Sequence, residues 1–174
     1  MSDVARLERL FASGALLRPD PAIPNLVDLS LSLARLGGAR GLASSPSVDR
    51  IEKIIGKAEH LVFVLVDGLG MNLVESEPFL RSHTAMELRS IFPSSTAPAL
   101  TSLATGLWPG RHGVPAWWTH LPRLGMTATI LHYTERFEGK PLPARIEETF
   151  PAPTLLPRLS ADVCSFQPGP ITES

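Results

Sequence analysis

Apolar residues recur at helical spacing over the first 36 positions, with a proline-rich break between two stretches. The first stretch spans residues 4–17, and the sequence RPDPAIPN follows it. The second spans residues 25–36 and places four leucines on one helix face: Leu26, Leu29, Leu33 and Leu36. Asn25 is a residue type that caps helix N-termini, and Gly37-Gly38 is a typical helix stop. The pattern predicts two amphipathic helices joined by a connector that prolines make rigid.

The pattern changes after this point from helical periodicity to an unbroken apolar run. The sequence GGARGLASSPS reads as a loop, either a plain linker or a substrate lid, and a short helix is predicted over residues 48–57. Residues 61–66 are all apolar, rich in valine and without alternation, between His60 and Asp67. Such a run is typical of a strand buried on both faces of a parallel sheet. A helical pattern follows over residues 71–80.

A second strand and a proline-started helix are predicted next. Residues 86–92 have strand-like composition, and a helix is expected from Ala97-Pro98 to Thr105-Gly106 because proline is favoured in a first helical turn. This boundary places Thr96 at the helix N-terminus. Backbone N–H groups and the positive end of the helix dipole gather there, so phosphate binds readily and an alkoxide is stabilised.

The last third of the chain predicts strands with one surface excursion. Residues 116–120 and 126–133 are β-rich and joined by the turn LPRLG, whereas residues 134–153 carry four prolines and read as an excursion over the surface. A short helix over 154–159 and a strand over 161–166 complete the pattern. We expect an α/β fold with a mostly parallel central sheet, in which residues 1–47 form N-terminal helices and a linker and residues 48–174 form the main domain.

Composition narrows the classes of partner and location. Sixteen Lys and Arg against seventeen Asp and Glu give no overall charge to attract nucleic acid or an anionic membrane. The single cysteine, Cys164, excludes an intramolecular disulfide and a four-thiolate zinc site, and it reads as a small buried residue or a reactive thiol. Charged residues interrupt the N-terminus and no apolar run is long enough to span a membrane, so neither a signal peptide nor a membrane segment is expected. The cytoplasm is the default location.

Two polar residues stand at positions where chemistry is expected. Asp67 follows the apolar run, where it can act as a metal ligand, a nucleophile or a helix cap. Thr96 can act as a nucleophile or as a cap. Further along, Arg111 and His112 can contact an anion or a metal, although a histidine between turn residues is also a common structural hydrogen-bonding group. Trp117 and Trp118 can line a pocket or pack in a core.

The segments around Asp67 and Thr96 together resemble the alkaline phosphatase superfamily, in particular its type I phosphodiesterase / nucleotide pyrophosphatase branch. The resemblance rests on LVFVLVDGLG at 61–70 and FPSSTAPALTSLATGLWPGRHGV at 92–114. It implies that Asp67 binds a zinc ion and that Thr96 is the nucleophile, which also touches the metal. It further implies a two-zinc site, attack on a phosphorus ester, and an alkaline-phosphatase-like α/β/α sandwich of which this chain carries the N-terminal half.

The sequence also departs from this family. Nucleotide pyrophosphatases carry an asparagine a few residues beyond the His-Gly pair, and Trp117 stands about where it would be. Further aspartates and histidines of the family's metal site come from a later half-domain, and His120, His132 and Asp162 fit none of those motifs. We therefore expect a truncated chain that is inactive by itself, because a catalytic zinc generally needs three protein ligands. Uncovered surface in a half-domain also predicts self-association.

Competing hypotheses remain open at this level. The chain can belong to a phosphonoacetate hydrolase or a phosphomonoesterase of the same superfamily. It can also be a non-catalytic binding or interaction domain that keeps the fold and a phosphate-attracting helix end. For the hydrolase, the resemblance implies a small phosphate ester or nucleotide as the substrate. A phosphatase with Asp67 as its nucleophile would normally have a second aspartate two residues on, where this chain has Leu69.

Overall fold

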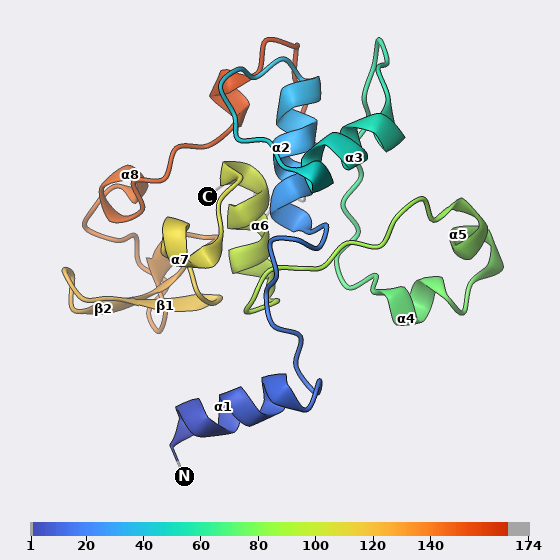
Figure 1. The fold of residues 1–174 in the computed structure, drawn as a ribbon. Helices are drawn as coiled ribbons and strands as arrows, with labels where there is room; N and C mark the ends of the chain where they lie inside the picture. The colour runs from blue at the N-terminus through green and yellow to red at the C-terminus, as the bar shows by residue number, and fades with distance from the viewer. Residues whose placement is uncertain (1, 167–174) are drawn as a thin grey trace.

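The computed structural model describes residues 2–166. Its α-helices are α1 (Asp3–Ala12), α2 (Leu26–Leu36), α3 (Pro46–Ile55), α4 (Met71–Val74), α5 (Pro78–His83), α6 (Thr96–Thr105), α7 (Pro109–His112) and α8 (Ile146–Thr149). Its strands are β1 (Trp118–Leu121), β2 (Met126–Thr129) and β3 (Thr134–Glu135), and a short 3-10 helix covers Leu156–Arg158. Helices α2, α3 and α6 form the centre of the molecule, and the β-hairpin lies beside α7 (Figure 1).

The predicted fold class is wrong for the structure. Within the described part of the chain the sheet has three strands in the order β1-β2-β3, and both pairings are antiparallel. No mostly parallel central sheet is formed by these residues. The hairpin is local and needs only a tight turn, whereas parallel strands need partners supplied by distant segments.

Three predicted strands are absent from the described residues. Residues 61–66 are 43–82% exposed, and none of their backbone groups makes a hydrogen bond within the described chain. Residues 86–92 contribute only one parallel bridge, between Arg89 and Asn25. Residues 161–166 form no strand either. In each case the strand prediction relied on apolar composition, and composition does not supply a neighbouring strand.

Helix α2 packs through its small residues instead of its leucines. Its buried positions include Ser30, Ser32 and Ala34, whereas the leucines of the predicted apolar face are only half-buried. The Ser30 hydroxyl donates to the Leu103 carbonyl oxygen of α6 at 2.5 Å, and the Ser32 hydroxyl lies 3.2 Å from the Val48 carbonyl oxygen of α3. Small side chains let the backbone of α2 approach those of α3 and α6 closely, and the buried positions therefore mix polar residues with Val27 and Ala34.

The predicted cap of α2 is confirmed. Asn25 accepts hydrogen bonds from the backbone N–H groups of Val27 and Asp28, and Asp28 in turn accepts from the Asn25 N–H, which completes a capping box. Burial raises the pKa of the Asp28 carboxyl, while hydrogen bonds from Ser45 and Asn25 act in the opposite direction. The local sequence thereby fixes the start of α2, the helix against which α3 and α6 pack.

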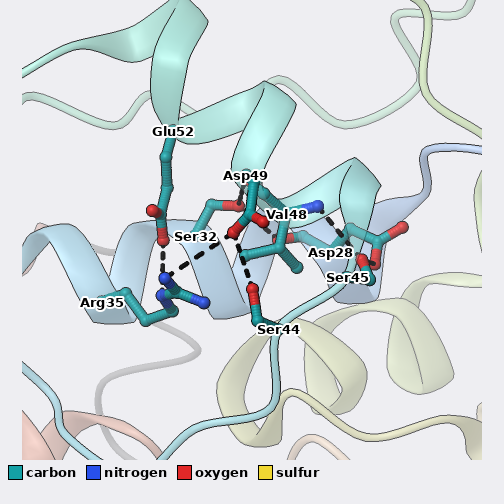
Figure 2. Close-up of polar contacts among 8 residues, drawn as sticks. All are labelled: Asp28, Ser32, Arg35, Ser44, Ser45, Val48, Asp49 and Glu52. Carbon is teal, nitrogen blue, oxygen red and sulfur yellow. Dashed lines mark hydrogen bonds and ion pairs between the residues drawn. The ribbon is translucent and has the colours of Figure 1, made fainter.

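A polar network joins α2 to α3 (Figure 2). Arg35 Nε lies 2.7 Å from Glu52 Oε1, and its Nη2 lies 3.7 Å from Asp49 Oδ1. The Ser44 hydroxyl donates to Asp49 at 2.6 Å, and the Ser45 hydroxyl donates to Asp28 at 3.1 Å. These contacts hold the loop before α3 against α2, and the apolar side chain of Val48 is fully buried in the same interface.

Two apolar clusters pack against opposite ends of α6. The larger cluster joins the first turn of α6 to the β-hairpin and consists of Ala97, Val114, Leu121, Ala128, Ile130 and Leu142. The smaller consists of Ala34, Ala39 and Leu155. The predicted hairpin is confirmed, with Leu121 paired to Met126, although β2 ends at Thr129 and not at residue 133.

Two parts of the chain extend away from this centre. Helix α1 has no buried residues, and Phe11 makes an edge contact with Phe92 at a centroid distance of 5.3 Å. Helices α4 and α5 protrude on the other side, where the predicted single helix over 71–80 is interrupted before Pro78 (Figure 1). None of the helices among the described residues has the length and hydrophobicity needed to cross a membrane.

Candidate functional site

The N-terminus of α6 is built around Ser95 and Thr96. Thr96 is the first helical residue, one position earlier than predicted, and Ser95 is the N-cap in an extended conformation. The Ser95 side chain makes no capping hydrogen bond, and its Oγ is buried without a hydrogen-bond partner among the described residues. Both residues are half-buried. The Ser95 hydroxyl therefore does not cap the helix, which is the usual role of a serine at this position.

The first turn of α6 leaves few backbone donors, all close to Thr96. The Ala99 N–H donates to the Ser95 carbonyl oxygen at 3.0 Å, and Pro98 has no N–H. Within the described structure the N–H groups of Thr96 and Ala97 have no hydrogen-bond partner. Ala97 is fully buried and Thr96 is half-buried, so an anion at this end would meet the Thr96 N–H and the positive end of the helix dipole.

Burial of the next residues fixes this turn in place. Ala97 and Pro98 are fully buried, and Ala97 belongs to the larger apolar cluster. At the other end Gly106 adopts a φ of 66° as the C-cap, and its N–H donates to the Ser102 carbonyl oxygen at 2.8 Å. The Thr-Gly step of the sequence motif is thus a helix stop that glycine makes without strain.

His112 links α6 to α7 and serves as a structural group. Its ring is 2% exposed, with Nε2 3.0 Å from the Ser102 hydroxyl and Nδ1 accepting from the Val114 N–H at 3.2 Å. Because Nδ1 accepts, we assign the proton to Nε2. Burial lowers the pKa of His112, and a hydrogen bond with the Pro98 backbone opposes that shift. With both nitrogens occupied, this histidine has no free lone pair for a metal.

The structure does not bring Asp67 into this site. Asp67 lies in an exposed segment, residues 57–70, and no hydrogen bond or ion pair within the described chain joins it to Thr96. Residues 2–166 also contain no group of three or more His, Cys, Asp or Glu side chains that could hold a metal ion. The roles of Asp67 and Thr96 stay predictions.

The two tryptophans behave differently. Trp117 is half-buried against the larger apolar cluster, as expected for at least one of the pair. Trp118 is 50% exposed, and the Arg136 guanidinium lies 4.2 Å from its ring centroid. Exposed Arg111 makes no side-chain contact that would orient it toward α6 within the described structure.

Sequence reasoning did not single out Ser95 or Ser102. With a predicted helix start at Ala97-Pro98, the N-cap signal points to Thr96, and no separate signal distinguishes Ser95, which is the N-cap in the structure. The hydrogen bond between Ser102 and His112 joins residues on two helices with a turn between them. No local pattern encodes that contact.

Comparison with known proteins gives one match. The family model described as type I phosphodiesterase / nucleotide pyrophosphatase matches residues 61–127, a segment that contains both Asp67 and Thr96. This partial match confirms the resemblance found in the sequence and supports hydrolysis of phosphodiester bonds in general. No curated protein and no solved structure matches the chain significantly.

Proposed function

We propose that residues 61–127 carry part of the active site of a hydrolase that cleaves phosphodiester or pyrophosphate bonds, with Thr96 as the nucleophile. The observation that carries this proposal is the family match over residues 61–127, a segment in which Thr96 is the first residue of α6. The free N–H group of Thr96 and the positive end of the α6 dipole support it, because they suit a phosphoryl group at that position.

The chemistry follows from the position of the hydroxyl. Thr96 Oγ1 gives its proton to the surrounding water and attacks phosphorus. The P–O bond to the leaving group breaks, and the leaving group departs with the electron pair and takes up a proton from water. Water then attacks the phosphothreonine ester, which restores the Thr96 hydroxyl and releases the phosphate product. The negative oxygens that develop at phosphorus would be stabilised by the Thr96 N–H and the positive end of the α6 dipole.

The activation of Thr96 needs a group that the described residues do not provide. A threonine hydroxyl is a weak nucleophile until a base or a metal lowers the cost of its deprotonation. No hydrogen bond or ion pair joins an ionisable side chain to Thr96 within the described part, and Asp67 is an exposed carboxylate. Zinc generally takes three protein ligands in a catalytic site, so these residues do not fit a resident zinc ion.

Asp67 would be one ligand of such a metal, and further carboxylates and imidazoles from outside the described residues would have to complete the set. Residues 2–166 by themselves would then have no turnover. The substrate class is a phosphate ester or nucleotide, and Trp117 in place of an asparagine leaves phosphonoacetate and phosphomonoester hydrolysis as alternatives within the superfamily.

A second candidate function is a non-catalytic domain that binds a phosphate ester at the start of α6. The incomplete ligand set favours it, because binding of a phosphate ester at a helix N-terminus needs no metal. Both candidates predict phosphate affinity at this helix end. Only the first predicts that Thr96 forms a covalent bond with phosphorus.

A chimera separates the two candidates. Residues 61–127 would replace the corresponding segment of an active type I phosphodiesterase, and hydrolysis of bis(p-nitrophenyl) phosphate would be measured. We expect activity in the chimera and a loss on the order of 10³-fold or more on Thr96→Ala. Ser94→Ala is the matched control, since it removes a neighbouring exposed hydroxyl. Equal activity of the Thr96→Ala and Ser94→Ala chimeras would overturn the nucleophile assignment.

A further inference from the structure

The buried ring of His112 forms hydrogen bonds to two separate parts of the chain. Its Nδ1 accepts from the N–H of Val114, in the segment that leads into β1, at 3.2 Å. Its Nε2 lies 3.0 Å from the hydroxyl oxygen of Ser102 on α6. The histidine is 2% exposed, so bulk water does not compete for these bonds. The ring therefore ties α6 to the chain that enters the β-hairpin.

The same ring also reaches the first turn of α6. A hydrogen bond joins it to the backbone of Pro98, which is the third residue of the helix and stands two positions after Thr96. Proline has no N–H, so its carbonyl oxygen accepts, and the protonated Nε2 of His112 is the donor. One imidazole thus contacts both of the first two turns of α6.

We propose that His112 is a positioning residue, which fixes the first turn of α6 relative to the β-hairpin and thereby fixes where the Thr96 hydroxyl lies. This inference rests on the proposed function, in which Thr96 is the nucleophile. The turn is also held by the buried methyl group of Ala97 in the larger apolar cluster. Apolar contacts are non-directional, whereas hydrogen bonds depend on angle, so the ring is the contact that fixes how the turn is oriented.

Helix α7 holds the ring itself in place. The His112 N–H donates to the Trp108 carbonyl oxygen at 3.1 Å, and the Gly113 N–H donates to the Pro109 carbonyl oxygen at 2.9 Å. Gly113 has a φ of 80°, a conformation that glycine adopts readily, and this turn brings the Val114 N–H back to Nδ1. The imidazole is therefore anchored before it reaches α6.

Two substitutions divide the bonds of the ring between its two nitrogens. His112→Asn places an amide oxygen near the position of Nδ1, which keeps an acceptor for Val114 but leaves nothing that reaches α6. His112→Gln places an amide N–H near the position of Nε2, which keeps a donor for Ser102 and Pro98. If the bonds to α6 position Thr96, glutamine should preserve the arrangement and asparagine should not.

Hydrogen exchange in the whole chain tests the structural half of the inference. The Ala99 N–H reports on the first turn of α6, where it donates to Ser95, and the Gly106 N–H reports on the other end, where it donates to Ser102. His112→Asn should raise exchange at Ala99 relative to Gly106 by about 5- to 10-fold. His112→Gln should leave that ratio within about twofold. An equal rise at both amides, or no rise at Ala99, would refute the inference.

A variant of Ser102 tests the same contact with the histidine intact, so the test does not depend on the folding of His112→Asn. Ser102→Ala removes the hydroxyl beside Nε2 but keeps the Pro98 carbonyl, so the exchange ratio should rise by about 2- to 5-fold. A ratio identical to that of the unsubstituted chain would count against the inference.

Kinetics of the chimera that carries residues 61–127 test the functional half. His112→Asn should lower kcat about 10- to 100-fold with KM little changed, because a misplaced nucleophile slows the reaction without removing a substrate contact. His112→Gln should restore most of kcat. His120→Asn makes the same change at an exposed histidine of the same segment and should leave kcat unchanged. Equal losses for His112→Asn and His112→Gln, or a rise in KM alone, would overturn the positioning role.

Failure of this inference and failure of the proposed function give different results. If the chimera keeps its activity on Thr96→Ala, the proposed function is wrong, and the exchange measurements on the whole chain are unaffected. If Thr96→Ala abolishes activity while His112→Asn keeps kcat, Thr96 is the nucleophile and the positioning role of His112 alone is refuted.

Discussion

Substitution of Gly106 by alanine tests how closely α6 is packed at its C-terminal end. Gly106 has a φ of 66°, and an added Cβ would lie 2.8 Å from Leu31 Cδ2 and 3.2 Å from Leu155 Cδ1. Leu155 is 6% exposed and belongs to the smaller apolar cluster, so it has little room to move away. Alanine at this position therefore meets both backbone strain and a packing conflict.

The two costs can be separated with a second glycine. Gly41 has a nearly identical φ of 67°, but a Cβ added there meets no atom within 4 Å. We expect Gly41→Ala to lower the free energy of unfolding by about 1 kcal/mol through backbone strain alone. Gly106→Ala adds an overpacking cost of about 1–2 kcal/mol, reduced because the atoms it meets are the ends of leucine side chains.

Urea unfolding followed by far-UV circular dichroism measures the difference. With a slope of about 2 kcal/mol/M, Gly41→Ala should shift the midpoint by about 0.5 M and Gly106→Ala by about 1–1.5 M. Equal shifts in the two variants would show that Leu31 and Leu155 yield freely. That result would refute the close packing of α6 against α2 described above.

The remaining predictions address the pH response, the cap of α2, its buried face and the metal. Because the folded-state pKa of His112 lies below the ordinary value of 6.5, stability is full above pH 6.5 and falls as the pH drops toward the folded pKa; urea midpoints at pH 7.5 and 5.5 should show the loss, and His112→Asn should reduce this pH dependence. Asn25→Ala should cost about 1–2 kcal/mol of unfolding free energy, and a change under 0.3 kcal/mol would contradict the capping role. Ala34→Leu should cost about 1–3 kcal/mol by overpacking the smaller apolar cluster with Ala39 and Leu155, and an unchanged midpoint would contradict that packing. Calorimetric titration of the chain with zinc should show no tight stoichiometric binding, and one-to-one binding lost on Asp67→Ala would show that the described residues suffice.

Local features of the fold could be predicted from the sequence because they depend on neighbouring residues. Asn25 caps α2 through N–H groups two and three residues away, and Gly106 ends α6 through a conformation that glycine adopts readily. The turn LPRLG likewise brings β1 and β2 together without any distant segment. In each case the energetic reason lies within a few residues of the signal.

Non-local features could not be predicted in this way. Residues 61–66 have the composition of a central strand, but a strand forms only where another strand offers its backbone groups, and none does so here within residues 2–166. Hydrophobicity predicts that α2 buries its leucine face. The close approach of α3 and α6 buries Ser30 and Ser32 instead. Segments that are distant in the sequence therefore decide whether residues 61–66 form a strand and which face of α2 is buried.

The candidate site likewise has one feature that depends on neighbouring residues and one that depends on distant segments. The sequence correctly placed Thr96 at the start of a helix, within one residue, because Pro98 and the preceding serines are local signals. The expectation that Asp67 lies beside it depended on two strand ends meeting in a parallel sheet. Since that sheet is absent from the described residues, the pairing of Asp67 with Thr96 remains the part that needs experiment.

The most direct test of the Thr96 assignment is to locate the covalent intermediate. Acid quenching of the chimera during turnover of bis(p-nitrophenyl) phosphate, followed by peptide mass spectrometry, should find the p-nitrophenyl phosphoryl group on Thr96. The peptide contains Ser94, Ser95 and Thr96, and fragmentation distinguishes the three hydroxyls. A label on Thr96 that disappears in the Thr96→Ala variant is the predicted result. A label on Ser95, or turnover that persists in Thr96→Ala, would contradict the account.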